Sequence, residues 1–145
     1  MHAMSRDEWL AFVHAGTRTG KLAVTRASGS PHVTPIWFLV DTTPDGDEVV
    51  FNTATNGLKA RALRRDPRFA LCVDDQAPPY SYVLIEGTAT LSEDLDEMRV
   101  WATRLGERYM GAEVAEAFGR RNAVPGECLV RGRITRVRAE ADVSV

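Results

Sequence analysis

The chain has 145 residues, of which 44% are hydrophobic and 26% are charged, and its formal net charge at pH 7 is −2. These values are typical of a globular domain long enough to bury a core, and they exclude a disordered or collagen-like chain. A negative net charge gives the whole molecule no electrostatic reason to bind nucleic acid, so any anion site must be local.

Hydrophobic periodicity and turn residues predict mostly short strands, with a few helices between them. A capping box formed by Ser5 and Glu8 marks the first helix, and Pro67 and Gly111 end two others. In chain order we expect a helix at 5–15, strands at 21–25, 32–40 and 49–53, a helix at 58–65, strands at 69–73 and 82–91, a helix at 94–110, a helical piece at 112–118 and a strand at 128–139.

Six short strands separated by turns predict a mainly β fold, a six-stranded antiparallel barrel that is closed or partly closed, with helices covering its openings. No repeat, low-complexity tract or linker divides the sequence, so residues 1–145 are expected to form a single domain.

No stretch reaches the roughly 18 apolar residues of a membrane span, and no signal-peptide core is present, so a cytoplasmic protein is expected. Cys72 and Cys128 lie in separate apolar runs and are interpreted as buried free thiols. The scattered His2, His14 and His32 predict no metal site, and His14 is interpreted as a cap at the end of its helix.

The most informative segment joins a strand to the helix at 58–65. The strand ends in Asn52 and Thr53, and the chain then passes Asn56 and a glycine before the helix begins. Free backbone N–H groups at a helix start, together with threonine and asparagine side chains, predict an anion cradle.

Lys59 lies in the first turn of this helix, at the middle of the inward-facing stripe, whereas Arg61, Arg64 and Arg65 are expected to face outward. A cation is disfavoured at a helix N-terminus, and a buried ammonium group needs a partner. We therefore interpret Lys59 as a phosphate ligand. The alternative is a lysine whose aliphatic stem covers apolar surface while its amine reaches water.

A second segment comprises Thr34, Pro35, Ile36 and Trp37. Pro35 removes one donor from the strand, which therefore lies at an edge or a bulge at that point. Unpaired backbone beside Trp37 is suited to the polar edge of a flat heterocycle. The alternative is that Pro35 only protects a sheet edge and that Trp37 belongs to the core.

No residue pattern indicates acid–base or nucleophilic catalysis, so no catalytic residue is predicted and reactivity would come from a cofactor. Near the C-terminus, Arg131, Arg133 and Arg138 alternate along the last strand and are interpreted as solvent-facing.

Together these segments resemble the pyridoxamine 5′-phosphate oxidase-like, FMN-binding split-barrel superfamily, and most of all its coenzyme F-420-dependent oxidoreductase branch. The resembling residues are 20–25, 29–38, 51–53, 59–68 and 83–89. The resemblance implies a homodimer that holds the cofactor in a groove at the subunit interface. It also implies that the strand from Thr34 to Trp37 lines the ring, while Asn52, Thr53 and Lys59 hold the phosphate.

Two departures from the family pattern bear on the cofactor. Where pyridoxamine phosphate oxidases carry an Arg–Lys pair, this sequence has Leu58 and Lys59. One cation suits the singly charged phosphodiester of F-420 better than the FMN monoester, whose charge approaches about −2. The sequence also shows no arginine- and proline-rich substrate segment after 138–142, so oxidation of vitamin B6 is not expected.

The main hypothesis is an oxidoreductase that uses reduced F-420 to transfer a hydride to a small unsaturated or quinone-like acceptor. One alternative is an FMN-binding oxidoreductase of the pyridoxamine phosphate oxidase type. Another is a non-catalytic protein that binds a flavin, a deazaflavin or haem, for which His32 is the one plausible axial ligand. The acceptor is expected beside the helices at 101–118, whose Tyr109, Met110 and Phe118 are expected to be exposed.

Overall fold

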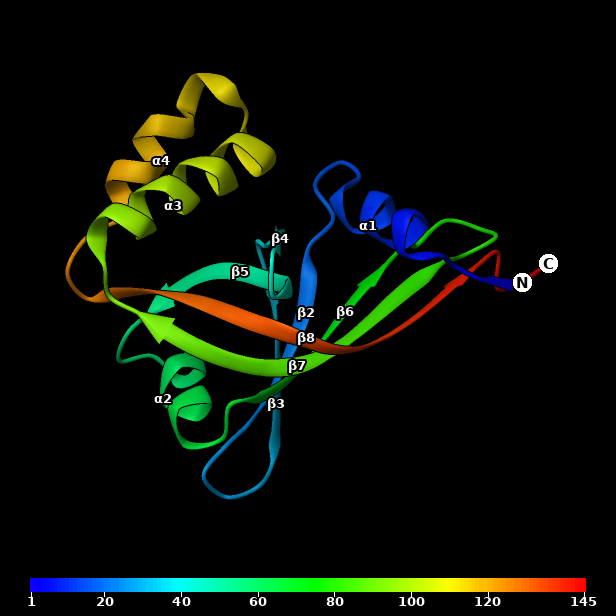
Figure 1. Cartoon of the computed structure of the whole chain (residues 1–145), viewed down its shortest axis with the longest axis horizontal. Helices are drawn as coiled ribbons and strands as arrows, with labels where there is room; N and C mark the ends of the chain where they lie inside the picture. The colour runs from blue at the N-terminus through cyan, green and yellow to red at the C-terminus, as the bar shows by residue number, and fades with distance from the viewer.

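A computed structural model describes residues 1–145 as one strongly bent antiparallel sheet, with α3 and α4 over one end and α1 near the other (Figure 1). The elements are β1 (His2–Ala3), α1 (Arg6–His14), β2 (Gly20–Thr25), β3 (Pro31–Ile36), β4 (Leu39–Thr43), β5 (Gly46–Ala54), α2 (Leu58–Arg65), β6 (Arg68–Asp74), β7 (Tyr82–Ser92), α3 (Leu95–Met110), a 3₁₀ turn (Ala112–Val114), α4 (Ala115–Asn122) and β8 (Glu127–Ala141). None of these helices is long and apolar enough to cross a membrane.

The sheet contains eight strands, in the order β3-β2-β6-β7-β8-β5-β4, with β1 added beside β8. The mainly β, antiparallel prediction is confirmed, but the count of six strands is wrong for two reasons. The expected strand at 32–40 breaks at Trp37 and Phe38 into β3 and β4. In addition, the chain start pairs with the end of β8, where His2 lies opposite Ala141.

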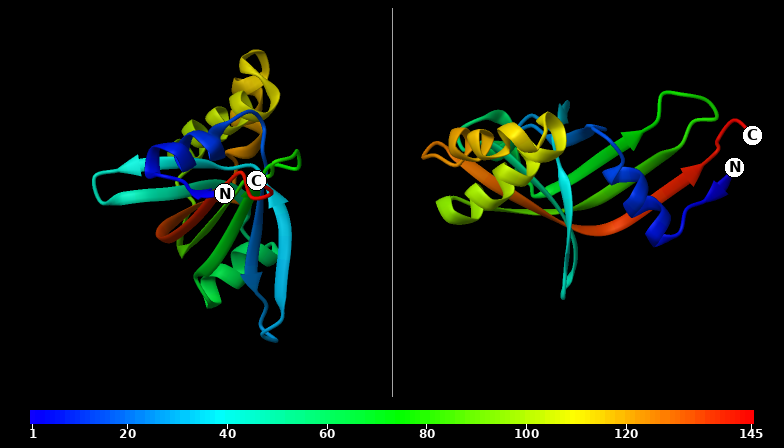
Figure 2. Two further views of the ribbon diagram at one scale, coloured as in Figure 1. Left: turned by 90° about the vertical axis from the view of Figure 1, so that its right-hand side faces the viewer. Right: turned by 90° about the horizontal axis from the view of Figure 1, so that it is seen from above.

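The break separates two strands that lie at opposite edges of the sheet. β3 pairs with β2, and β4 pairs with β5, so two residues join one edge to the other. The two edge hairpins leave this point in different directions (Figure 2). Because β3 and β4 do not pair with each other, the barrel is split rather than closed. Pro35 lies on edge strand β3, as its missing N–H predicts.

The end of α3 satisfies the backbone that the break leaves unpaired. The Phe38 N–H donates to the Tyr109 hydroxyl (3.1 Å), and the Arg108 guanidinium donates to the Phe38 carbonyl (2.7 Å). The Tyr109 hydroxyl in turn donates to the Arg18 carbonyl (2.9 Å), and Arg108 donates to that of Gly16 (3.1 Å). Burial raises the pKa of Tyr109, so the hydroxyl keeps the proton that it donates.

Two hydrophobic cores stabilise the fold. The main core contains 19 buried residues, lies inside the bent sheet and includes Phe38, Phe51 and Leu63. A second and much smaller core of Val50, Met98, Trp101 and Leu129 lies between α3 and the strands β5 and β8. The helical hairpin of α3 and α4 therefore rests on few apolar contacts of its own.

The sequence suggested that His14 caps its own helix. Instead, its side chain binds β4, the first strand after the break. The N–H of Val40 donates to His14 Nε2 (3.0 Å). Although the residue as a whole is solvent-exposed, this nitrogen must be unprotonated to accept the bond. Desolvation of the ring, together with the charge of Arg108, lowers the pKa of His14 below its ordinary value of 6.5.

This lowered pKa predicts a loss of stability in mild acid. The unfolded chain takes up a proton near the ordinary pKa while the folded chain does not, so the His14 contribution is complete above that value and is lost as the pH falls below it. We expect the free energy of unfolding, measured by urea denaturation, to fall from about pH 7.5 to about pH 5.5.

His14→Gln retains an acceptor for Val40 but does not titrate, so this variant should show a weaker pH dependence across the same interval. His32→Gln is the matched control and should keep the parent's dependence. Equal slopes for the parent and His14→Gln would contradict the assignment.

Candidate functional site

The turn between β5 and α2 leaves the helix start open to an anion. Gly57 is the N-cap residue, with extended backbone angles (φ −76°, ψ 171°), and no side chain caps the first turn. That turn also contains no acidic residue. The free N–H groups and the positive end of the helix dipole therefore meet no protein acceptor at this position.

Lys59 lies within the buried arc of α2, between the buried Ala62 and Ala60, and is itself partly exposed. It forms no ion pair in this structure and lines a cavity, whereas Arg61 and Arg65 line a different groove beside Arg26. The predicted separation of Lys59 from these two arginines is confirmed.

Arg64 is exposed, as expected for an outward-facing arginine, and it also makes contacts that the sequence did not indicate. Its guanidinium donates to both the carbonyl and the hydroxyl of Thr55, and the Thr55 hydroxyl donates to Glu93 Oε1 (3.0 Å). Arg64 thus holds the turn that leads into α2. The sequence pattern could not show this, because the partner lies nine residues earlier in a loop.

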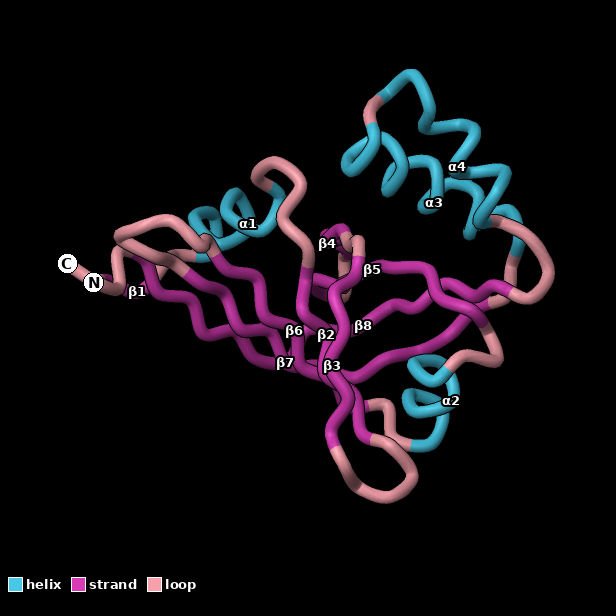
Figure 3. The backbone as a smooth tube through the Cα atoms, turned by 180° about the vertical axis from the view of Figure 1, so that it is seen from behind, coloured by secondary structure: helices cyan, strands magenta, loops and turns pink.

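The two predicted cofactor segments meet at one cavity of about 240 Å³. α3 and α4 lie on one side of the β5 end and α2 lies on the other (Figure 3). The lining residues are Pro35, Ile36, Trp37, Asn52, Thr53, Lys59, Ala102, Leu105 and Asn122.

Two predicted residues do not line this cavity. Asn56 is exposed in the turn before α2. Thr34 lies on the opposite face of β3 from Pro35, across from the buried Leu22, and its hydroxyl is buried without a partner. Thr34 is therefore absent from the cavity lining, although it belongs to the same edge strand as Pro35 and Ile36.

Asn52 has an unsatisfied polar atom at the cavity. Its amide nitrogen donates to the Asn122 carbonyl (3.4 Å), whereas its Oδ1 is buried with no hydrogen-bond partner. A buried acceptor without a donor costs about 1–3 kcal/mol. Together with the unpaired Lys59 and the uncapped helix, this atom fits a ligand that has an anionic group and O–H or N–H donors.

An aromatic cluster lies at the break, and one of its members, Trp37, lines the cavity. The Trp37 ring stacks on Tyr109 at a centroid distance of 5.1 Å and an interplanar angle of 5°, and Phe118 contacts it at 5.6 Å with a tilt of 59°. The expected exposure of Tyr109 and Phe118 is therefore wrong, because α3 and α4 fold over the break and bury both rings partly. Met110 is exposed, at 54%.

The sequence did not identify the wall that Ala102, Leu105 and Asn122 contribute to the cavity. The apolar stripe of the helix at 94–110 indicated a buried face, but periodicity does not show which strand that face covers. Elsewhere, no group of three or more potential metal ligands is present. The Nδ1 atom of His32, the one candidate for haem ligation, lies 3.0 Å from Arg26 Nη2.

A larger groove of about 430 Å³ lies on the outer face of the sheet. We call it the outer-face groove. Its apolar residues include the exposed Val33 (60%) and Leu84 (39%). Charged side chains of both signs border it: Lys21, Glu86, Arg136 and Arg138. Val33 and the cavity residue Pro35 lie on the same face of β3, so the groove and the cavity adjoin each other.

Comparisons with known proteins identify the family and the fold. The family model for pyridoxamine 5′-phosphate oxidase matches residues 5–141. The structure of the conserved hypothetical protein Rv2991 from Mycobacterium tuberculosis is 28% identical, with a TM-score of 0.80 over 98% of this chain and 89% of that one.

Two further structures share the fold at lower identity. An F420 reductase is 22% identical, with a TM-score of 0.66 over 88% of this chain and 94% of that one. A FAD-binding protein from Mesorhizobium loti is 18% identical, with a TM-score of 0.67 over 95% of each chain.

The unsatisfied atom of Asn52 predicts an unusual response to an apolar substitution. Asn52→Leu replaces the buried acceptor with an apolar side chain of similar shape and the same number of heavy atoms, so the free energy of unfolding should equal or exceed that of the parent by up to about 1 kcal/mol. Asn56→Leu, in the exposed turn, is the control and should change little. Chemical denaturation measures both, and a loss above about 1 kcal/mol in Asn52→Leu would show that Asn52 serves the fold.

Proposed function

The chain belongs to the pyridoxamine 5′-phosphate oxidase family, and from this premise we propose that it is a cytoplasmic oxidoreductase using reduced coenzyme F-420. The substrate class is a small unsaturated or quinone-like acceptor that receives a hydride.

The observation that carries this proposal is the single unpaired cation at the cavity. Lys59 stands beside the uncapped start of α2, and the residue before it is Leu58. Arg61 and Arg65 line another groove and Arg64 binds Thr55, so no second arginine or lysine lines the cavity. A phosphodiester with one negative charge matches this arrangement better than a monoester with a charge of about −2.

The residues at the cavity divide into three roles. Lys59 and Thr53, with the free N–H groups of α2, would bind the phosphate, and the Asn52 carbonyl would accept a hydrogen bond from the linker. The backbone from Pro35 to Trp37 would meet the polar edge of the ring. When bound, reduced F-420 supplies the hydride.

The apolar wall completes the site. Ala102 and Leu105 are buried, and with Trp37 they would exclude water and hold the acceptor against the ring. No side chain at the cavity is assigned as an acid, so the contribution of the protein is orientation and a fixed electrostatic environment.

A second candidate cofactor is a flavin nucleotide, FMN or FAD, because one structure of the same fold is that of a FAD-binding protein. A flavin would support turnover with oxygen or a nicotinamide through the same cavity. The number of cations at the phosphate distinguishes the two cofactors physically.

Cofactor titration tests the assignment of Lys59. We expect F-420 to quench protein fluorescence at lower concentrations than FMN or FAD. Lys59→Ala removes a charge-assisted hydrogen bond worth about 1.5–3 kcal/mol, which should weaken F-420 binding roughly 10- to 100-fold. The control is Arg61→Ala, on the same helix but outside the cavity, and it should bind like the parent. Equal losses in both variants, or tighter binding of FMN, would overturn the proposal.

We also propose that the chain forms a homodimer through the outer-face groove. An exposed apolar strip that includes Val33 and Leu84 and has charged residues along its border suits a self-complementary two-fold contact. Since β3 carries both Val33 in the groove and Pro35 at the cavity, the second copy would also border the cofactor.

Leu84→Arg places a charge in the middle of this strip and should convert the dimer into a monomer with weaker cofactor binding. Val100→Arg, on the exposed side of α3 (49% exposed), is the matched control and should leave the mass unchanged. Analytical ultracentrifugation measures the mass. A parent protein that sediments as a monomer would contradict the dimer without affecting the assignment of Lys59.

A further inference from the structure

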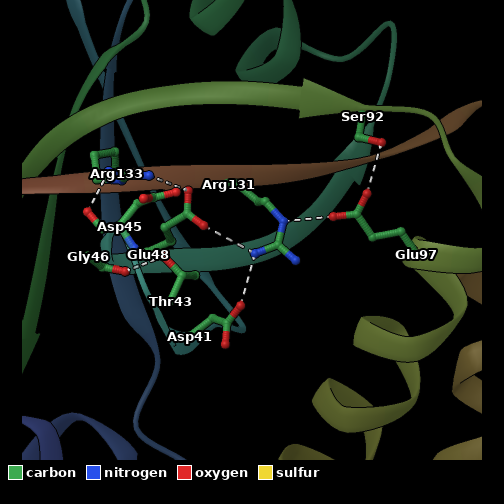
Figure 4. A network of polar contacts seen from close by, with 9 residues as sticks. All are labelled: Asp41, Thr43, Asp45, Gly46, Glu48, Ser92, Glu97, Arg131 and Arg133. Atoms are coloured by element: carbon green, nitrogen blue, oxygen red, sulfur yellow. Dashed lines mark hydrogen bonds and ion pairs between the residues drawn. The ribbon is translucent and has the colours of Figure 1, made fainter.

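One arginine joins four separate elements of the fold. Arg131, on β8, donates from Nε to Glu97 Oε1 of α3 (2.7 Å). Its Nη1 donates to Asp41 Oδ2 of β4 (3.1 Å) and to Glu48 Oε1 of β5 (3.4 Å), and Figure 4 shows these contacts converging on one guanidinium. We call these four residues the Arg131 network.

This arrangement corrects the expectation that Arg131 simply faces solvent. Its side chain is 23% exposed, and the three carboxylates around it are 14–31% exposed. The neighbouring Arg133 is closer to the expectation, at 42% exposed, and it reaches Glu48 at 3.8 Å and the Asp45 carbonyl but contacts nothing on α3. Within this pair, Arg131 alone links the sheet to the helical hairpin.

The network continues into the small second core. The Arg131 guanidinium carbon lies 5.3 Å from the centre of the Trp101 ring, a cation–π distance. Trp101 is buried and packs with Val50, Met98 and Leu129. Arg131 therefore contacts α3 twice, through Glu97 and through Trp101.

The same core lies directly behind the cavity wall. Ala102 follows Trp101, Leu105 lies one turn later, and both line the cavity. On the sheet side, Asn52 follows Val50 by two residues on β5 and is paired with Leu129 on β8. A rotation or shift of the first half of α3 would therefore change the distance between Ala102 and Asn52.

Both ends of α3 are anchored by polar contacts, with the cavity wall between them. Arg108 and Tyr109 hold the C-terminal end at the break, and Arg131 holds the N-terminal end on the sheet. A four-residue core offers few apolar contacts to specify the position of a 16-residue helix. Because the N–H groups of a guanidinium point in fixed directions, its hydrogen bonds orient α3 on the sheet as well as attract it.

We propose that Arg131 is a positioning residue of the cofactor site. It sets the position of α3 on the sheet, and with it the position of the wall that Ala102 and Leu105 present to the flat ring, without touching the ligand. The identity of that ligand rests on the proposed function, whereas the anchoring of α3 does not.

The test compares variants that break the network with one that does not. Arg131→Met keeps the length of the side chain but removes the guanidinium, and Glu97→Gln weakens the same link from the α3 side. Arg131→Lys restores the charge without the planar guanidinium. Arg133→Met, two residues along the same face of β8, is the matched control.

Two measurements on the full-length protein decide the outcome. Arg131→Met should weaken F-420 binding at least 10-fold and leave the affinity for inorganic phosphate unchanged, because Lys59 and the α2 start are not displaced. Amide hydrogen exchange in residues 95–107 should accelerate in Arg131→Met and Glu97→Gln. Arg131→Lys should be intermediate in both measurements, and Arg133→Met should match the parent.

The two hypotheses fail in different ways. If the parent binds neither F-420 nor a flavin, the proposed function fails, and hydrogen exchange alone then decides whether Arg131 anchors α3. Unchanged exchange in Arg131→Met, or an equal acceleration in Arg133→Met, would overturn the role of Arg131. An equal loss of phosphate and F-420 affinity would also overturn it, because the effect would then not be specific to the ring.

Discussion

The break at Trp37 and Phe38 is the constraint on which the rest of this molecule depends. Two residues carry the chain from one edge of the sheet to the other, and their peptide groups cannot join either ladder. Unpaired buried backbone groups are costly, and here the end of α3 supplies the partners through Arg108 and Tyr109. The same contacts bring the Tyr109 ring onto Trp37 and place α3 above the β5 end. The break between β3 and β4 therefore both opens the barrel and fixes α3 as one wall of the cavity.

The basic side chains of α2 point to different partners, and this arrangement defines the candidate anion site. Four of its eight residues are basic, yet each arginine has a direction different from that of Lys59. Arg64 holds the turn at Thr55, and Arg61 and Arg65 border another groove, which leaves Lys59 alone at the cavity. Because a phosphate is recognised by local charge and free N–H groups, the net negative charge of the chain is no obstacle to such a site.

The helical hairpin of α3 and α4 depends on polar contacts more than its apolar stripe suggests. Its own core has four residues, and the Arg131 network and the Arg108 contacts anchor its two ends. Partly buried charge networks of this kind add little net stability compared with apolar packing, but they restrict geometry, since each carboxylate fixes one direction of the guanidinium. A helix held in this way is suited to form one side of a cavity that binds a flat ring.

The sequence by itself determined the local features: the helix starts at Ser5 and Asp94, the antiparallel strands, the edge position of Pro35 and the orientation of Lys59 away from Arg61 and Arg65. Each of these depends on a period or a backbone preference that acts over a few residues. The tertiary structure alone decided that the strand expected at 32–40 divides, that Tyr109 and Phe118 are partly covered, that Arg64 binds Thr55, and that Arg131 is partly buried in a charge network. These outcomes depend on partners 9 to 90 residues away, such as Thr55 for Arg64 and Asp41 for Arg131, and no local pattern encodes contacts that exist only once the sheet has bent and α3 has closed over the break.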